Sequence, residues 1–234
     1  MFFKGPSKLM RLLKEQEWDE ALFHLAQNPN EAMRWDTVPI HPHSTFEIKC
    51  LPIHEACALG PPTLAIVEEL VRAFPGSLSL VDDHFGRTPL HTACSKGASS
   101  EIIHYLLEQY PAAASLQDIL GRTPLHYAIC DHAPYETVVE LVERCPLAAR
   151  LQDNNGWLPL HVACRYGATH EIFKLLVDAY PPGLDVKTKS CGMTPLMCAN
   201  RFKVCMEQSS LDLLRLHDIP AQNSPLDQKN ITAT

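Results

Sequence analysis

The chain has no long apolar run and no excess of positive charge, and each absence excludes a class of protein. None of its apolar stretches approaches the roughly 18 residues that a membrane-spanning helix needs. The segment from Met1 to Lys8 has no apolar core, so we expect no secretory signal. With 20 Lys and Arg against 27 Asp and Glu, the net charge is −7. We therefore expect neither nucleic acid nor a membrane as a partner.

Motifs that mark catalytic and metal sites are also missing from the sequence. There is no Gly-x-Ser-x-Gly elbow, no phosphate-binding Gly-rich loop and no His-Glu-x-x-His pair, so we expect no enzyme and no cofactor. The nine cysteines are an odd number and include no Cys-x-x-Cys pair. Because we expect no secretion signal, we expect these cysteines to be reduced thiols and the protein to lie in the cytoplasm or the nucleus.

What the sequence does contain is one short phrase, repeated five times. The phrase reads Thr-Pro-Leu-His or a close variant of it, and its copies begin 35–37 residues apart at Leu51, Thr88, Thr123, Leu158 and Thr194. A fixed period between about 20 and 50 residues is typical of a stacked array. Such an array presents an extended surface, so the period predicts binding rather than an enclosed catalytic pocket.

The residues around each phrase predict a unit of turn, helix, helix and loop. Asp-x-x-Gly, which begins at Asp83, Asp118 and Asp153, is typical of a turn because Asp bonds nearby backbone and Gly adopts a positive φ. Thr followed by Pro is typical of a helix start. In the second helix the apolar residues recur with helical spacing. A proline ends this helix in four copies, at Pro75, Pro111, Pro146 and Pro181.

The pattern Asp-x-x-Gly-x-Thr-Pro-Leu-His, followed by a small pair such as Ala93-Cys94 or Ala163-Cys164, resembles the ankyrin repeat family over roughly residues 46–216. The resemblance implies an all-α solenoid of helix-turn-helix repeats with short hairpin-like turns. Two features depart from the family: proline and small residues replace its usual Gly-Ala, and the period exceeds the common 33 by about two residues. Both departures predict a slightly longer outer loop.

We divide the chain into three parts. Residues 1–45 read as a helical N-terminal cap, a degenerate repeat with amphipathic helices at 7–16 and 18–27 and an insertion at 38–45. Residues 46–217 hold the five recognisable repeats, and the last of them ends with a helix near 210–217. Residues 218–234 are polar and interrupted by proline, so we expect a disordered tail.

Three copies have a His-x-x-Cys spacing, which makes a thiol- or metal-responsive protein one alternative. The spacing occurs at His54/Cys57, His91/Cys94 and His161/Cys164, and His24, His41 and His43 form a second candidate group. Structural zinc needs four converging ligands, whereas a buried free cysteine behaves as a small apolar residue. In the ankyrin family this histidine ties adjacent turns together. We therefore expect no metal site.

The resemblance also implies where a partner binds, because in the ankyrin family five variable positions per unit line the concave face. Here these positions carry five cations against a single acid, Asp131, together with several aromatic residues, while acids gather on the second helices. Arginine and aromatic residues are enriched at interface hot spots. The residues that we expect to contact a partner are Phe85, Arg87, Lys96, Leu120, Arg122, Trp157, Arg165, Tyr166, Arg201 and Phe202.

These expectations combine into one function. We expect a monomeric, non-catalytic module that binds an acidic or aromatic-containing segment of another protein through its concave face. A second alternative is a regulatory subunit that acts on an enzyme in trans, because no second domain is visible to carry the chemistry.

One position also bears on stability. Leu51 and Leu158 stand where the other three copies have a capping Thr. Since the loss of such a cap costs about 1 kcal/mol, the sequence predicts that Leu158→Thr raises the melting temperature.

Overall fold

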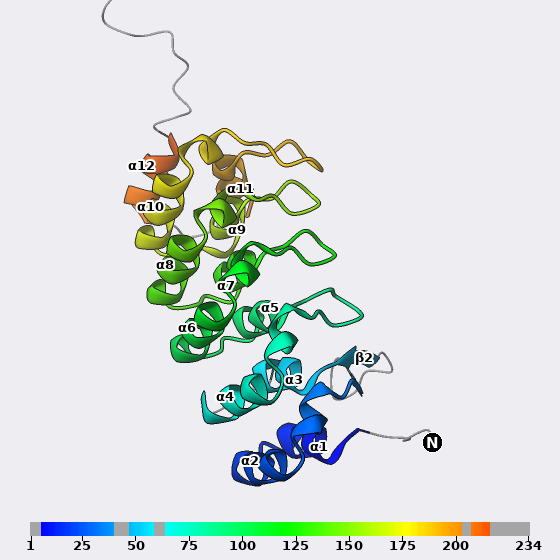
Figure 1. Ribbon diagram of the computed structural model, residues 1–234. Helices are drawn as coiled ribbons and strands as arrows, with labels where there is room; N and C mark the ends of the chain where they lie inside the picture. Colours follow the sequence, from blue (N-terminus) through cyan, green and yellow to red (C-terminus); the bar gives the residue numbers. More distant parts are fainter. Residues whose placement is uncertain (1–5, 40–46, 59–63, 203–206, 216–234) are drawn as a thin grey trace, which may run out of the picture.

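The computed structural model describes residues 6–39, 47–58, 64–202 and 207–215. Within them, pairs of helices stack one upon the next to form a solenoid, and a row of turns projects from one side of the stack (Figure 1). The predicted solenoid is confirmed. The described residues add one feature that the prediction of an all-α fold omitted, a small two-stranded sheet. The predicted tail at 218–234 and the histidines His41 and His43 lie outside the described residues.

The first helix of each repeat begins at the proline of the repeated phrase. Thr or Leu stands just before this proline, whose missing N–H costs nothing at a helix start. Two of these helices stop next to Gly97 and Gly167, which adopt positive φ angles of 64° and 72°. The first helices are α3 (Pro52–Ala58), α5 (Pro89–Ser95), α7 (Pro124–Cys130), α9 (Pro159–Tyr166) and α11 (Pro195–Phe202).

The second helix of each repeat is amphipathic, and in the first four repeats it is longer than the first helix. Its apolar side faces the first helices, and its polar side faces solvent. The second helices are α4 (Leu64–Ala73), α6 (Ser100–Gln109), α8 (Tyr135–Arg144), α10 (His170–Ala179) and α12 (Gln208–Arg215).

The prolines predicted to end the second helices do so, but no extended loop follows them. Each proline instead begins a short 3-10 helix, which places small residues such as Ala113 and Ala114 in the core. The extra length of the repeat is therefore folded into this helix rather than into a longer loop. The 3-10 helices are η1 (Pro29–Met33), η2 (Pro75–Ser79), η3 (Pro111–Ser115), η4 (Pro146–Arg150) and η5 (Pro181–Leu184).

The N-terminal segment has the same order of elements as a repeat. The helices α1 (Lys8–Lys14) and α2 (Trp18–Gln27) precede η1, and their apolar faces join the common core. The chain on either side of the predicted insertion at 38–45 pairs as antiparallel strands β1 (Asp36–Pro39), which includes its first two residues, and β2 (Glu47–Cys50), which follows it. This ribbon stands where the other units have a turn (Figure 1).

The turn of the second copy corrects one residue of the sequence alignment. The sequence pattern assigned the turn aspartate to Asp83, but buried Asp82 has that role, because its carboxylate accepts the backbone N–H of Arg87. Asp118 accepts the equivalent N–H in the next copy. Asp83 instead pairs with Lys49 of β2: its carboxylate accepts the Lys49 N–H at 2.6 Å, and its own N–H donates to the Lys49 carbonyl. The turn is one residue longer than aligned.

Successive turns are joined at their tips by backbone hydrogen bonds. Ile119 donates to the carbonyl of Phe85, and Asn154 donates to the carbonyl of Leu120, at 3.0 and 2.9 Å. Lys189 continues the series to Asn155 at 2.8 Å. These bonds hold the turns at a fixed spacing, so side chains at equivalent positions form rows along the stack.

A buried histidine ties each of the first four copies to the copy that follows it. In the second copy, His91 Nδ1 accepts the Thr88 N–H at 3.2 Å, and Nε2 lies 3.1 Å from the carbonyls of both Leu116 and Arg122. The accepting role of Nδ1 leaves the proton on Nε2, which donates to the following turn. His54 and His161 make the corresponding bonds in their units, and His126 bonds the Thr123 N–H and the carbonyl of Trp157.

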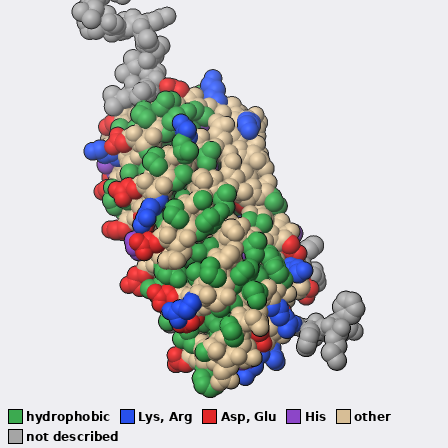
Figure 2. Space-filling view, viewed as in Figure 1, with side chains coloured by type: hydrophobic (Ala, Val, Ile, Leu, Met, Phe, Trp, Pro, Cys, Tyr) green, Lys and Arg blue, Asp and Glu red, His purple; other side chains and the backbone are tan. Residues whose placement is uncertain are grey.

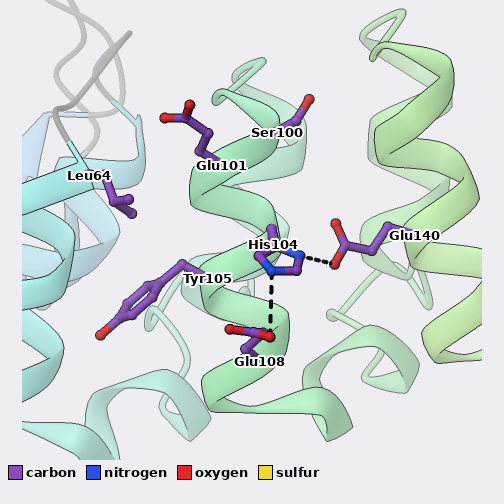
Figure 3. A pocket seen from close by; sticks show the side chains of 7 residues that line it. All are labelled: Leu64, Ser100, Glu101, His104, Tyr105, Glu108 and Glu140. Atoms are coloured by element: carbon purple, nitrogen blue, oxygen red, sulfur yellow. Dashed lines mark hydrogen bonds and ion pairs between the residues drawn. The ribbon is translucent and has the colours of Figure 1, made fainter.

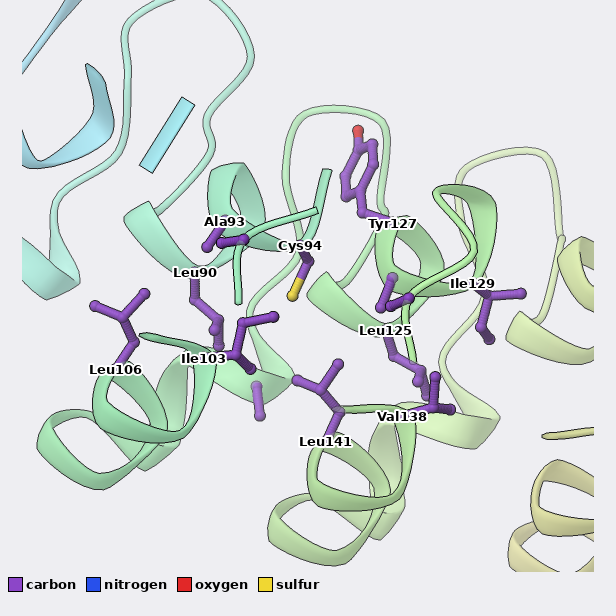
Figure 4. Packing of buried hydrophobic residues seen from close by; sticks show 14 of the residues in the cluster. Leu90, Ala93, Cys94, Ile103, Leu106, Leu125, Tyr127, Ile129, Val138 and Leu141 are labelled. Atoms are coloured by element: carbon purple, nitrogen blue, oxygen red, sulfur yellow. The ribbon is translucent and has the colours of Figure 1, made fainter. Parts of the chain in front are cut away.

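The core is continuous along the stack. Side chains of α5 and α7, such as Leu90 and Leu125, meet side chains of α6 and α8, such as Ile103 and Leu141 (Figure 4). Cys94 lies among them and is 1% exposed. Each unit therefore buries its apolar face only against its neighbours, as expected for a repeat array.

Leu158 is part of this core rather than a defective cap. Its side chain is 1% exposed, and its Cδ1 lies beside Gly183 of η5. The Leu158 N–H donates to His161 Nδ1 at 3.2 Å, so the histidine already satisfies the amide at this helix start. The side chain therefore contributes apolar burial, and the structure reverses the sign expected from the sequence.

We predict that Leu158→Thr lowers the melting temperature. The substitution removes buried methyl groups, whose transfer from water contributes about 0.8 kcal/mol per carbon, and adds a hydroxyl worth at most about 1 kcal/mol. Leu158→Val is the matched control, because Val has the shape of Thr without its hydroxyl. Thermal unfolding should rank the wild type above both variants. A Thr variant that melts above the wild type would contradict the apolar role.

The histidine row predicts how stability depends on pH. Burial lowers the pKa of His54, His91 and His126 to about 4 and also lowers that of His161. Below about pH 6.5 the unfolded chain takes up protons that the folded chain refuses, so the free energy of unfolding falls. At pH 5 the expected slope is about 1 kcal/mol per histidine per pH unit.

Chemical denaturation at pH 7, 6 and 5 measures this slope. His132→Asn is the control, because His132 is exposed and its φ of 55° suits Asn. This variant should keep the full dependence on pH. Constant stability between pH 7 and 5, or imidazole NMR signals of the buried row that titrate near pH 6.5, would show that these rings are not held neutral.

Candidate binding surface

Four of the predicted partner-binding residues line one hollow of about 370 Å³ beside the turns. We call this hollow the turn-side groove. Its walls come from three consecutive turns and from α7 and α9, and they combine apolar, polar and cationic side chains. The lining residues are Arg122, His126, Cys130, Asp153, Asn155, Trp157, Val162, Arg165, Tyr166 and Ser190.

Arg165 is the centre of a group that we call the arginine–aromatic cluster, consisting of Trp157, Arg165, Tyr166 and Phe202. The Arg165 guanidinium carbon lies 4.7 Å from the ring centre of Phe202, 5.5 Å from that of Trp157 and 5.6 Å from that of Tyr166. The Trp157 and Phe202 rings are 6.2 Å apart. A guanidinium over ring faces is attracted by their π electrons, by about 0.5–1 kcal/mol at exposed sites. The cluster therefore holds Arg165 in place without a carboxylate.

Phe85 and Arg87 belong to a second group, in which the arginine is already engaged. The Arg87 guanidinium stacks at 4.5 Å on the rings of both Phe85 and Tyr127 and donates to the Tyr127 hydroxyl at 2.8 Å. Its Nε lies 3.7 Å from a carboxylate oxygen of buried Asp118. This arginine ties two turns together, and its charge is largely neutralised by Asp118.

Arg122 stands between the two groups. Its guanidinium carbon is 5.7 Å from the Tyr127 ring centre, and its Nε is 3.7 Å from Asp153. The side chain is 39% exposed and lines the turn-side groove, so it combines a turn tie with an accessible edge. Arg87 and Arg122 stand at equivalent positions in consecutive copies, yet Arg122 exposes more of its side chain to a partner, 39% against 19%.

The remaining predicted residues lie outside the groove. Lys96 is exposed just after α5, and Leu120 is 42% exposed at a turn tip, where its carbonyl accepts the Asn154 N–H. Arg201 is exposed at the end of α11, with its Nη1 3.9 Å from Met193 Sδ. None of these three side chains lines the hollow.

Tyr127 and the buried aspartates Asp118 and Asp153 contribute to this surface although the sequence pattern did not mark them as part of it. Tyr127 is 7% exposed and donates its hydroxyl proton to Asp118 at 2.6 Å. Burial raises the pKa of this tyrosine, and the bond to Asp118 adds to the shift, so it stays a neutral donor. The turn motif had marked Asp118 and Asp153 only for backbone bonds. The expected balance of five cations against Asp131 alone therefore omits two carboxylates that lie under Arg87 and Arg122.

The arrangement of helix pairs and the histidine ties agree with a comparison to known families. The sequence pattern of the family described as ankyrin repeats (3 copies) matches residues 53–144 and again residues 130–216. The chain belongs to the ankyrin-repeat family. No curated protein sequence matches this ankyrin-repeat chain.

Ankyrin repeats are in general modules for protein–protein interaction and are typically non-catalytic. Among the described helices of this ankyrin-repeat protein, none is long and apolar enough to cross a membrane. Within the described ranges, no three His, Cys, Asp or Glu side chains converge in a way that could hold a metal ion.

The His-x-x-Cys pairs have a structural role in this ankyrin-repeat protein. Both ring nitrogens of His91 and of His161 are hydrogen-bonded to the backbone. Burial raises the pKa of the neighbouring thiols, that of Cys57 to about 12 and those of Cys94 and Cys164 far above the ordinary value. A protonated, buried thiol is neither a nucleophile nor a metal ligand.

Cys191 differs from these core thiols, and we predict that it is the most reactive described cysteine. It is exposed in a turn, and hydrogen bonds from the hydroxyl groups of Thr188 and Ser190 lower its pKa. Brief treatment with iodoacetamide at pH 7, followed by peptide mass spectrometry, should modify Cys191 well before Cys57 or Cys94. The variant Cys191→Ser should lose this fast reaction. Early labelling of Cys57 or Cys94 in the folded protein would contradict the burial of the repeat thiols.

Proposed function

We propose that this chain is a non-catalytic interaction module that binds an acidic, aromatic-containing segment of a partner protein in the turn-side groove. The observation that carries the proposal is the arginine–aromatic cluster. Arg165 is exposed, stacks on three rings and has no carboxylate within ion-pair distance among the described residues. An oriented guanidinium without a counter-ion is suited to receive the carboxylate of a partner.

The rings next to Arg165 supply the second half of the recognition. Tyr166 is 40% exposed and Phe202 is 36% exposed, so both keep accessible apolar surface. Aromatic side chains bury much area with little loss of conformational entropy, which makes them frequent anchors in interfaces. An acidic residue of the partner would pair with Arg165, while an adjacent aromatic residue covers Trp157 or Phe202.

Pre-organisation favours this proposal. The carbonyl of Trp157 accepts a hydrogen bond from His126, and the carbonyl of Arg122 accepts one from His91. The backbone that carries two groove residues is therefore fixed by the preceding unit. A rigid surface loses little entropy when a partner binds.

The other roles considered for the chain receive less support. A thiol- or metal-responsive protein would need available thiols or imidazoles, yet the repeat pairs are buried and hydrogen-bonded. A regulatory subunit that acts on an enzyme in trans is consistent with the same groove, and it would make the enzyme the bound partner. We further propose that the protein acts as a monomer in the cytoplasm or the nucleus.

The test begins with peptides selected from a random displayed library on the immobilised wild-type protein. We predict that the selected sequences are enriched in Asp or Glu next to Phe, Tyr or Trp. A fluorescent copy of the best peptide should bind Arg165→Glu at least about tenfold more weakly by anisotropy. Arg165→Lys should give an intermediate loss, because lysine keeps the charge but lacks the flat face.

Arg150→Glu is the matched control, since Arg150 is exposed at the end of η4 and away from the groove. Its affinity for the peptide should stay within about twofold of the wild type. Circular dichroism checks that every variant keeps its helices. Selected peptides without acidic enrichment, or equal binding by Arg165→Glu, would refute the assignment of the groove.

A further inference from the structure

The solenoid has a second hollowed surface on the side away from the turns. Two adjoining hollows of about 530 and 440 Å³ lie along α4, α6 and α8 and share His104 and Glu140. We call them together the second-helix groove. In Figure 1 these helices form the edge opposite the projecting turns, and the first helices stand between the two. The groove is therefore separate from the site of the proposed function.

The floor of the second-helix groove includes exposed apolar surface. Leu64 and Tyr105 form one wall of the larger hollow (Figure 3), while Tyr135 and Val139 line the smaller one. Tyr135 is 42% exposed at the start of α8, whereas Val138, Leu141 and Val142 of this helix are buried. Aromatic side chains that are left open in a hollow are typical of protein interfaces.

The rim of the groove is strongly acidic. Five carboxylates line the two hollows, and Arg144 is the single Lys or Arg side chain among the lining residues; the carboxylates belong to Glu101, Glu108, Glu136, Glu140 and Glu143. In Figure 2 red acidic side chains gather along the edge formed by the second helices. This distribution repels phosphate groups and so disfavours nucleic acid and anionic lipid as occupants.

Internal contacts use only part of this negative charge. His104 Nδ1 lies 2.6 Å from Glu140, and its Nε2 lies 3.5 Å from Glu108 (Figure 3). The Arg144 guanidinium lies 3.8 Å from the Glu108 carboxylate and 3.7 Å from the Glu140 carboxylate. Glu101, Glu136 and Glu143 make no ion pair within 4 Å among the described residues and are exposed.

The same contacts give the groove a fixed shape. The His104–Glu140 bond joins α6 to α8, and the hydroxyls of Ser100 and Thr137 join the same helices at 3.1 Å. A cationic group that enters the groove therefore meets pre-placed carboxylates, with little reorganisation needed.

We propose that the second-helix groove binds a segment of a partner protein that carries lysine or arginine side chains beside an apolar residue. The cations would pair with Glu101, Glu136 and Glu143 on the rim. The apolar residue would cover Tyr105 or Tyr135. Charge complementarity of this kind directs association and selects against acidic competitors.

The experiment uses a fluorescent amphipathic peptide of lysine and leucine, about four helical turns long, and a matched peptide with glutamate in place of lysine. The full-length chain should bind the lysine peptide, more weakly as salt increases, and should not bind the glutamate peptide. The double variant Glu101→Lys/Glu136→Lys should bind at least about tenfold more weakly. Both side chains are exposed, so the variant should keep its fold by circular dichroism.

Glu171→Lys is the matched control, because Glu171 is the second residue of α10 just as Glu101 and Glu136 are the second residues of α6 and α8. Its affinity should stay within about twofold of the wild type. Tyr135→Ser should weaken binding several-fold while leaving the charge unchanged. Carbodiimide cross-linking should join peptide lysines to α6 and α8.

Several results would overturn the proposal. Weakening by Glu171→Lys that equals, per reversed charge, the weakening by the double variant would show attraction by net charge alone. Undiminished binding by the double variant, or cross-links confined to other helices, would place the peptide elsewhere. Arg165→Glu should leave this affinity unchanged, so that a failure at one groove can be told apart from a failure at the other.

Discussion

The interaction on which the rest of the structure depends is the hydrogen bonding of a neutral, buried imidazole between consecutive units. In the second copy, His91 accepts the N–H that begins its own helix and donates to two carbonyls of the following turn. Each bond adds only about 1 kcal/mol, yet an unsatisfied buried group costs about 1–3 kcal/mol, so the arrangement is stable only when it is complete. Protonation would place a second donor at Nδ1, opposite an N–H. Burial prevents this by lowering the pKa to about 4.

The same bonds place the residues of the proposed partner site. Among the carbonyls that accept from His91, His126 and His161 are those of Arg122, Trp157 and Met193, each of which directly precedes the residue before a helix-starting proline. Backbone atoms at this position are fixed by the unit before, while the side chain projects beside the turns. Variation of the side chain therefore leaves the stack intact and changes only the surface. This separation explains how a repeat with a constrained core can carry an arginine in one copy and a tryptophan in the next.

The sequence was sufficient for the elements that depend on local chemistry and on periodicity. Thr-Pro marked the helix starts, and the prolines marked the helix ends, because both effects act within a few residues. It failed where the outcome depends on neighbours in space. Asp82, rather than Asp83, accepts the backbone hydrogen bonds of the turn, because the Asp83 carboxylate accepts the N–H of Lys49 in the preceding unit. Leu158 looked like a missing cap because its contact with η5 is visible only in the fold. The row of arginines looked uniformly available because the aspartates beneath Arg87 and Arg122 have partners on adjacent turns.

The distribution of charge connects the two proposed surfaces. The chain carries a net charge of −7, yet its acidic residues are not spread evenly. In the turns, Asp118 and Asp153 are buried beneath arginines, whereas the acidic residues of the second helices line the surface. A segment rich in carboxylates is attracted to Arg165 and repelled by the rim of the second-helix groove, and a cationic segment meets the reverse. Each surface thus excludes the partner of the other by the same electrostatics that attracts its own. Since the first helices separate the two proposed grooves, we expect binding at one to leave the other open, so that a single stack holds two partners of opposite charge on its opposite sides.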